Sequence, residues 1–370
     1  MLAWIKHPPG LGRVVLPLVC GFIFGSCSSL FLFRRAVQHS PTPYRHLGQE
    51  DGAGIPPIVH FVQLKEERAS RLHFSFEAFL ALYAAYANVH PATIYIHHDF
   101  SHEEIADAVR RGTLWTRQVL TAFPCLRLNS VTAPTEANGY NITRVEHRSD
   151  FVRLEQLRRH GGIYLDWDVV TLRPLESLRR AGFQAVVGRQ FDDFINNGIL
   201  LATPQSAAMR IFADEAQRVF DGGWITHSVK LLTRVADRLA AAAGEVLIMD
   251  HKAFAPFSWE QASVDALLRR HTGEAVPEPT PASVTDPGQT SADELWATRS
   301  AVTDQHAWIY DFSDALFLHK IFNSVDSPPG YTGVNVPYIL ARDSNYALAT
   351  WPLVMKGIKD RLIDPRDDTY

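Results

Sequence analysis

Two carboxylates placed two residues apart, Asp166 and Asp168, are the residues of this chain most clearly suited to chemistry. They follow the apolar residues 163–165 and would repel each other unless a positive group lay between them. A divalent cation relieves this repulsion, and magnesium and manganese prefer oxygen ligands of this kind and bridge them to phosphate. A D-x-D triplet alone is usually a solvated turn, so its meaning depends on the elements that position it.

The residues before the pair predict a helix. Ser149 can cap a helix that runs to about His160, with Asp150 in its first turn, where the helix dipole favours a negative charge. Arg153 lies three residues after Asp150 and therefore shares its face. Two glycines at 161 and 162 then supply a left-handed stop.

A strand is predicted directly after these glycines, over residues 163–168. Its period of two would place Tyr164, Asp166 and Asp168 on one face. Strand and helix patterns alternate along the chain, with strands predicted at 58–62, 93–97, 185–188 and 198–202, a helix at 74–88, and a helix capped by Ser101. This alternation predicts an α/β domain with a mainly parallel sheet flanked by helices, which binds ligands at the carboxyl ends of its strands.

The run from Ser149 to Pro174 resembles the sugar-binding region of the DXD-motif glycosyltransferases, family 32. This group includes α-1,6-mannosyltransferases, mannosyl-inositol-phosphoceramide synthases and α-1,4-galactosyltransferases. Residues 55–61, 196–202, 253–259 and 318–324 are similar to further motifs of the family, although isoleucine and phenylalanine at 321 and 322 replace a frequent tryptophan. The resemblance implies a GT-A fold, Rossmann-like, as a single catalytic domain over residues 55–370.

The resemblance also implies a metal-dependent, retaining transfer of a hexose from a UDP- or GDP-sugar to a glycan or glycolipid. The cofactor would be Mn²⁺ or Mg²⁺. Asp168 would bind the metal directly, and Asp166 would bind it through water or contact the ribose or donor sugar. His319 would be a third metal ligand or a pyrophosphate contact, and Lys320 would neutralise phosphate.

The remaining roles implied by the resemblance concern the donor. Asp150 and Arg153 would hold its sugar hydroxyls and act in catalysis with Asp166 and Asp168, while the other donor contacts would be His60, Tyr164, Asn196 and Asn197. Each has an ordinary structural alternative: a helix-surface ion pair for Arg153, core packing for Tyr164, a strand position for His60 and turn chemistry for the asparagines. No nucleophile is required if the leaving phosphate accepts the proton, but Asp150 or Glu155 remains open in that role.

The amino-terminal part of the chain predicts a membrane anchor. Residues 14–33 are uncharged and apolar between flanking arginines, and about 20 apolar residues span a bilayer. We expect a cytoplasmic tail at 1–13, a transmembrane signal anchor at 14–33 and a stem at 34–54, as in a single-pass type II Golgi protein with a lumenal catalytic domain. A cleaved signal peptide and a buried helix are the alternatives. The sequon at Asn141 agrees with glycosylation in the lumen.

Composition limits the other possibilities. The formal net charge is −4, and no basic stripe is interleaved with aromatic residues, which argues against a nucleic-acid partner. Residues 274–294 are rich in Pro, Ser, Thr and acidic residues and predict a disordered surface loop. Three other functions compete with the transferase: a non-catalytic carbohydrate-binding protein on the same fold, a toxin-like protein glucosyltransferase, and a hydrolase with paired carboxylates.

Overall fold

The structure, a computed structural model, describes residues 54–66, 71–191, 193–272, 308–321, 326–328 and 330–370. The chain divides into Met1–Asp51 and a compact unit, Gly52–Tyr370, and all described residues belong to the second. The predicted tail, the anchor at 14–33, nearly all of the stem and the loop at 274–294 lie outside the described residues. Within the described part of the chain, no helix combines the length and apolarity needed to cross a membrane.

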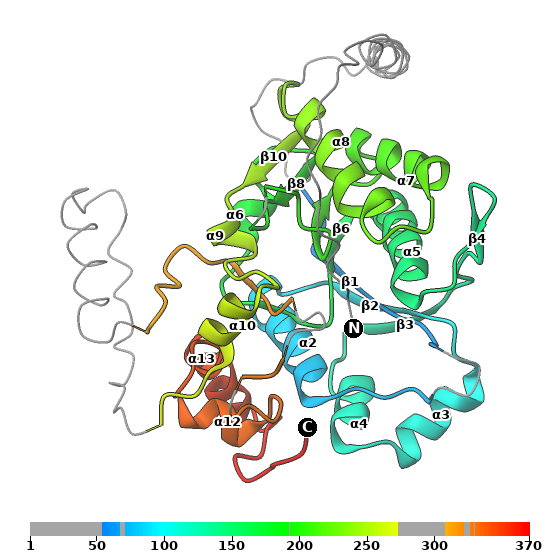
Figure 1. Ribbon diagram of the computed structural model, residues 1–370. Coiled ribbons are helices and arrows are strands. Elements are labelled where there is room, and N and C mark those ends of the chain that lie inside the picture. The colour runs from blue at the N-terminus through cyan, green and yellow to red at the C-terminus, as the bar shows by residue number, and fades with distance from the viewer. Residues whose placement is uncertain (1–53, 67–70, 192, 273–307, 322–325, 329) are drawn as a thin grey trace, which may run out of the picture. The chain divides into compact units, whose positions relative to one another are not determined.

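A seven-stranded sheet forms the centre of the fold (Figure 1). Its strands are β1 (Ile58–Gln63), β2 (Thr93–His98), β3 (Leu126–Ser130), β6 (Gly162–Leu165), β8 (Ala185–Gly188), β9 (Ile199–Ala202) and β10 (Val246–Met249), in the spatial order β10-β8-β9-β6-β1-β2-β3. Only β9 runs antiparallel to its neighbours. The prediction of a mainly parallel α/β sheet is therefore confirmed, and β9 begins at the edge where the other strands end.

Helices cover both faces of this sheet. They are α2 (Phe76–Val89), α3 (His102–Arg111), α4 (Leu114–Thr121), α5 (Val145–His160), α6 (Glu176–Arg179), α7 (Ala207–Val219), α8 (Leu231–Leu239), α9 (His251–Phe254), α10 (Gln261–Leu268), α12 (Val336–Ala341) and α13 (Asn345–Lys359), with a kinked turn, η1 (Thr226–Lys230), before α8. Two small ribbons complete the elements: β4 (Glu136–Ala137) with β5 (Tyr140–Asn141), and β7 (Val169–Thr171) with β11 (Phe317–His319).

Period-two alternation along the strands produces two separate hydrophobic cores. In β6, Ile163 and Leu165 pack in the core that includes α2, α10, α12 and α13, whereas Tyr164 packs in the core that includes α5, α7 and α8. Figure 1 shows these two groups of helices on opposite sides of the strands. Strands buried on both faces consist mainly of apolar residues, which is why β6, β8 and β9 appear in the sequence as nearly continuous apolar runs.

The central helix begins one turn earlier than predicted. Helix α5 starts at Val145 after Arg144, which makes no side-chain cap, and Ser149 lies inside the helix. The ring of His147 packs against Phe220 and His227, so tertiary contacts stabilise a first turn that lacks a polar cap. The prediction that Ser149 caps the helix is therefore wrong, and the additional turn carries residues 145–148.

The strand after the glycines is shorter than predicted. Strand β6 ends at Leu165, and the amide of Val169 donates to the carbonyl of Asp166 over 3.1 Å, which closes a tight turn over residues 166–169. Asp166 and Asp168 therefore do not share the face of one strand. They are brought together by the turn, and β7 then leads the chain away to pair with β11.

Candidate active site

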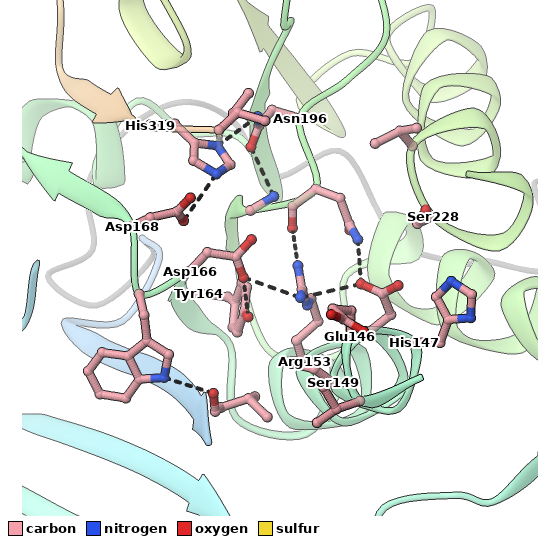
Figure 2. Close-up of a pocket in the computed structure, with 18 of the residues that line it drawn as sticks. Glu146, His147, Ser149, Arg153, Tyr164, Asp166, Asp168, Asn196, Ser228 and His319 are labelled. Carbon is pink, nitrogen blue, oxygen red and sulfur yellow. Dashed lines mark hydrogen bonds and ion pairs between the residues drawn. The ribbon is translucent and has the colours of Figure 1, made fainter. Parts of the chain in front are cut away.

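A pocket of about 750 Å³ opens at the edge of the sheet where the parallel strands end (Figure 2). Its wall is built from the ends of β1 and β6, the first turns of α2 and α5, the loop before β9, the segment that enters η1, and the end of β11. Asp150, Arg153, Tyr164, Asp166, Asp168, Asn196, Asn197 and His319 all line it. The structure thus brings together eight of the ten donor and metal residues singled out in the sequence.

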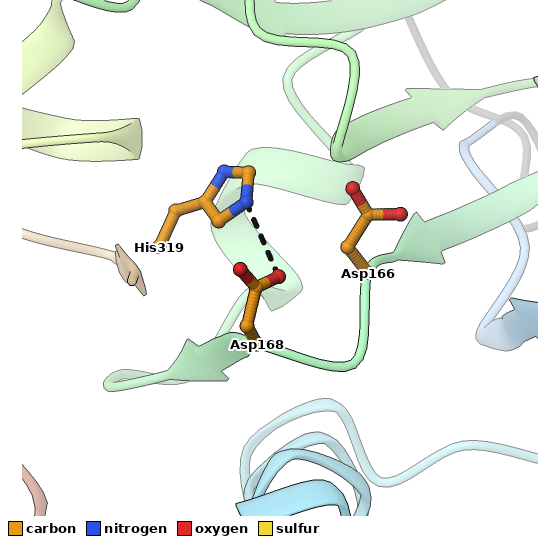
Figure 3. A group of neighbouring side chains, drawn as sticks. All are labelled: Asp166, Asp168 and His319. Atoms are coloured by element: carbon orange, nitrogen blue, oxygen red, sulfur yellow. Dashed lines mark ion pairs between the residues drawn. The ribbon is translucent and has the colours of Figure 1, made fainter. Parts of the chain in front are cut away.

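Asp166, Asp168 and His319, which we call the ligand group, offer one donor atom each within 4.8 Å of one another (Figure 3). His319 Nε2 lies 3.2 Å from Asp168 Oδ1. The pairing of β7 with β11 sets His319 opposite Val169, and the backbone amide of Lys320 donates to the carbonyl of Asp168 over 3.1 Å. A long-range strand pair therefore delivers the imidazole to the turn that carries both carboxylates.

Gly198 makes room for the ligand group. A Cβ atom at this position would lie 2.6 Å from Asp166 Oδ2 and 2.6 Å from His319 Cε1, well inside van der Waals contact. The carbonyl of Gly198 also accepts a hydrogen bond of 2.9 Å from the amide of Asp166. The start of β9 thus approaches the carboxylate and imidazole as closely as a backbone can.

A buried arginine joins the ligand group to helix α5. Arg153 Nη2 lies 3.3 Å from Asp150 Oδ1 and 3.2 Å from Asp166 Oδ1, and Nη1 donates to the carbonyl of Asn197 over 2.8 Å. Its guanidinium stacks 4.3 Å from the centre of the Tyr164 ring, whose hydroxyl donates to Asp166 Oδ1 over 2.5 Å. The helix-surface ion pair considered for Arg153 is excluded, because the side chain is only 7% exposed and points into this network.

The two carboxylates of the ligand group differ in their affinity for a proton. Burial raises the pKa of Asp166 above its ordinary value, and the attraction of Arg153 does not offset it. Burial alone would also raise the pKa of Asp168. The charge and hydrogen bond of His319, together with the charge of Lys320, outweigh burial and lower this pKa. Burial lowers the pKa of His319, but Asp168 reverses this, so the net shift is upward. Asp168 is thus held as an anion beside a ring that gains positive charge.

Asp150 is fully engaged by its neighbours. Its Oδ1 accepts from Asn197 Nδ2 over 2.8 Å, and its Oδ2 lies 3.0 Å from Nε2 of His227, which is completely buried. Arg153 is its third partner. A carboxylate held in this way is suited to orienting other groups and poorly suited to attacking a sugar. Glu155 is exposed and pairs with Arg158, and it does not line the pocket, so the structure does not support either residue as a nucleophile.

His60 does not lie at the predicted base site. Its ring is completely buried, donates to or accepts from His97 Nε2 through Nδ1 over 2.9 Å, and contacts the carbonyl of Gly161 through Nε2 at 2.8 Å. It faces α5 from the middle of β1, whereas the pocket is lined by the later residues 62–64. The prediction that His60 contacts the donor is corrected: it is part of the core.

Lys320 also differs from its prediction. Its ammonium donates to Glu77 Oε2 over 2.7 Å, and Lys320 lies outside the pocket wall to which Glu77 belongs. Direct neutralisation of phosphate by Lys320 is therefore not supported, although its charge lowers the pKa of Asp168.

Asn141 is exposed on β5 and does not line the pocket.

Several residues that line the pocket were not predicted. Glu146 and His147 come from the additional first turn of α5, Trp224 comes from the segment that enters η1, and Ser228 lies within η1. His227 does not line the pocket, but its Nε2 contacts Asp150 Oδ2. Nothing in the local sequence marks these residues, because long-range packing of α7, η1 and α8 against α5 brings Trp224, His227 and Ser228 beside its first turn.

Comparison with known proteins identifies the central region. The family model described as "Glycosyltransferase sugar-binding region containing DXD motif" matches residues 83–183, a range that contains Asp150, Arg153, Asp166 and Asp168. "Glucan organizing enzyme 1" of Cryptococcus neoformans var. grubii serotype A (strain H99) is 26% identical over 238 residues, which cover 60% of this chain. The matched part spans only 59% of that relative.

Two solved structures are similar to parts of this chain, and one of them is described as a glycosyltransferase. GlyE of Streptococcus pneumoniae TIGR4 is 11% identical, with 85% of this chain and 66% of that chain covered and a TM-score of 0.40. An active-site mutant of LgtC is 13% identical, with 81% and 95% covered and a TM-score of 0.36. At these TM-scores the likeness is partial. The interpretation of the chain as a glycosyltransferase therefore depends on the family match at residues 83–183 and on the site residues within it.

Proposed function

We propose that this chain, in which residues 83–183 match a glycosyltransferase sugar-binding region containing a DXD motif, moves a hexose from a UDP- or GDP-sugar to a hydroxyl group of a glycan or glycolipid. The reaction would depend on a divalent cation and retain the anomeric configuration. The observation that carries this proposal is the convergence of the ligand group with Arg153 and Asp150 in one pocket at the edge of the sheet.

The residues present fit a divalent cation. Two carboxylate oxygens and one imidazole nitrogen converge, Gly198 leaves space beside them, and Asp168 is held as an anion. Asp166, Asp168 and His319 would hold Mn²⁺ or Mg²⁺, which prefer oxygen-rich sites. When bound, such a cation would stabilise the negative charge that develops on the departing nucleoside diphosphate.

The chain's own residues would orient the donor sugar. Arg153 is fixed by Asp150, Asp166 and the carbonyl of Asn197, so its position is set before a ligand arrives. Asn197 Oδ1 is a buried acceptor with no hydrogen-bond partner among the described residues, and Asn197 lines the pocket. A sugar hydroxyl donating to this atom would satisfy it, since buried polar atoms are rarely left unpaired.

The carboxylates beside Arg153 are already engaged, which supports retention without a covalent intermediate. The acceptor oxygen would bond to the anomeric carbon on the face from which the diphosphate departs, as the bond from that carbon to the phosphate oxygen breaks. The hydroxyl proton would pass to the departing phosphate oxygen. Asp150 would keep its hydrogen bonds to Asn197 and His227 throughout and orient the site.

A thermal-shift panel with the full-length chain tests the proposal. UDP-glucose, UDP-galactose and GDP-mannose are each added with and without MnCl₂. We expect one nucleotide class to raise the melting temperature only when manganese is present, because the cation joins the diphosphate to the ligand group. If none of these donors shifts the melting temperature with manganese, the transferase proposal is wrong.

Asp168→Asn provides the matching variant. It removes the anionic ligand but keeps the shape, so we expect the manganese-dependent shift to disappear and transfer to fall by about 100-fold or more. Asp214→Asn is the control, because Asp214 is exposed on α7, away from the pocket. Full transfer by Asp168→Asn would contradict the assignment of the ligand group.

We also propose that the chain acts in the Golgi as a single-pass type II membrane protein with a lumenal catalytic unit. This proposal is supported by the uncharged residues 14–33 with their flanking arginines, and by the exposed sequon at Asn141.

A further inference from the structure

We propose that Glu146, His147 and Trp224, which we call the platform, bind a sugar ring of the acceptor. The inference rests on the proposed transferase function and adds two things to it: the place where the acceptor binds, and its chemical class, a saccharide whose pyranose ring stacks on an aromatic side chain.

The platform lies in the same pocket as the ligand group but on another part of its wall. In Figure 2, His147 lies on one side of Arg153, and Asp168 and His319 lie on the other. Arg153 therefore lies between His147 of the platform and the ligand group. A donor held by the ligand group and Arg153 leaves the platform open, so a second substrate bound there would face the donor sugar.

Trp224 presents a large apolar surface to this part of the pocket. Trp224 is 46% exposed, although tryptophan is highly buried on average. The guanidinium of Arg144 lies 5.3 Å from its ring, and the ring of His147 lies 5.3 Å away at a tilt. Arg144 lies over one face of the indole, yet the residue stays 46% exposed, so apolar surface remains available to the apolar face of a pyranose.

The backbone that carries Trp224 is held by several hydrogen bonds. Ser228 Oγ donates to the carbonyl of Trp224 over 3.2 Å. Asp221 accepts from the amide of Gly223 over 2.8 Å and from the hydroxyl of Thr226 over 3.1 Å. The backbone at Trp224 is thus ordered before a ligand binds, which lowers the entropy lost on binding.

Two polar groups flank the indole on the first turn of α5. His147 is 3% exposed, and its Nε2 has no hydrogen-bond partner among the described residues. Burial and the neighbouring His227 lower the pKa of His147, so its ring is neutral and can exchange a hydrogen bond with a hydroxyl. Glu146 is exposed on the pocket wall and can accept from further hydroxyls.

An exposed indole beside an imidazole and a carboxylate favours a saccharide over an acyl chain as the bound part of the acceptor. A pyranose has an apolar face bordered by hydroxyls, which matches an indole bordered by a carboxylate and an imidazole. An acyl chain would have to bury against the Glu146 carboxylate, which is unfavourable without a partner for the charge. The platform therefore fits the sugar part of a glycan or glycolipid.

Kinetics of Trp224→Ala with methyl glycosides of glucose, galactose and mannose as acceptors test the proposal. We expect KM for the best wild-type acceptor to rise about tenfold or more, while the dissociation constant of the manganese-bound donor stays the same. Trp224→Phe keeps an aromatic face and should recover most of the affinity. Glu146→Gln should raise the acceptor KM by a smaller factor. Tyr370→Ala is the control, because Tyr370 is 49% exposed and lies outside the pocket wall.

The outcomes separate this inference from the proposed function. An unchanged acceptor KM in Trp224→Ala would overturn the inference, and so would weaker donor binding in a variant that circular dichroism shows to be folded. A wild-type chain that binds donor but transfers to none of the glycosides would overturn the saccharide assignment and leave donor binding intact. A wild-type chain that binds no donor would overturn the proposed function itself.

Discussion

Gly198 shows how much the site depends on a missing side chain. Gly198→Ala needs no unusual backbone conformation, but its Cβ would displace Asp166 and His319 from each other. We expect manganese affinity to fall by about 10- to 100-fold, as it does when the support of metal ligands is disturbed, with little change in melting temperature. Isothermal titration with MnCl₂ measures the affinity.

Gly139→Ala is the contrasting control. Gly139 has a φ of +77° in the β4–β5 turn, and no described atom lies within 4 Å of the point that a Cβ would occupy there. Alanine at this position should lower stability by about 1 kcal/mol because of backbone strain alone, and manganese affinity should stay the same. Equal manganese affinity in Gly198→Ala and the wild type would contradict the close packing described at the ligand group.

His227 is a positioning residue for Asp150. Replacing it by phenylalanine preserves the stacking with Phe151 but removes the hydrogen bond to Asp150 Oδ2. A buried carboxylate that loses a donor is destabilised by about 1–3 kcal/mol, so we expect Asp150 to shift and the donor KM to rise about tenfold. His227→Gln retains a donor and should recover part of the loss. A donor KM that is the same in all three proteins would exclude this role.

At the scale of elements, β1, β2 and α5 enclose a chain of histidines that must be neutral. His60 Nε2–H donates to the carbonyl of Gly161, His60 Nδ1 accepts from His97 Nε2–H, and His97 Nδ1 accepts from Asn129. A proton added to either ring would set two donors against each other. Burial accordingly lowers the pKa of His60 to about 4 and that of His97 to about 2.

Acid should therefore destabilise the fold. The folded pKa values lie below the unfolded value of about 6.5, so the unfolded chain binds more protons, and stability is lost as the pH falls below about 6.5. At pH 5 the loss amounts to about 2 kcal/mol for each ring. Urea unfolding of wild type and His97→Gln at pH 7.5 and pH 5 measures it. The variant should lose about 2 kcal/mol less, and His73→Gln, at an exposed position, should behave like wild type.

Local patterns predicted the elements that local forces determine. The apolar runs of β1, β2 and β8 were predicted within about a residue, and Ser101 caps α3 with Glu104 in a reciprocal pair. The start of α5 and the end of β6 were predicted wrongly, because contacts with η1 and β11 determine them. These contacts join segments far apart in the chain.

The same difference between local patterns and long-range contacts explains which site residues were predicted correctly. Asp150, Arg153, Asp166 and Asp168 belong to one continuous run, and His319 was found through the resemblance of its own segment to the family. His60 and Lys320 were misplaced, because their partners, His97 and Glu77, come from elements whose alignment no local pattern indicates. Trp224 and His227 left no signal for the same reason.

At the scale of the whole molecule, the proposed location predicts a modification. Asn141 follows an exposed turn on β5, so passage through the secretory pathway should add a glycan there. Treatment with peptide N-glycosidase F should shift the mobility of the chain expressed in a eukaryotic cell. Asn141→Gln should lack the shift and keep its activity. A wild-type chain that shows no shift, and that alkaline carbonate releases from membranes, would contradict the proposed location.

The pairing of β7 with β11 has a consequence for biosynthesis. His319 reaches the two carboxylates only through this ribbon, and its segment is translated long after the turn at 166–169. Contacts between such distant segments form late because closing a long loop is entropically unfavourable. A growing polypeptide on the ribosome therefore lacks the proposed third ligand until the segment that contains β11 has emerged, so we expect full cation affinity to arise only after that segment has paired with β7.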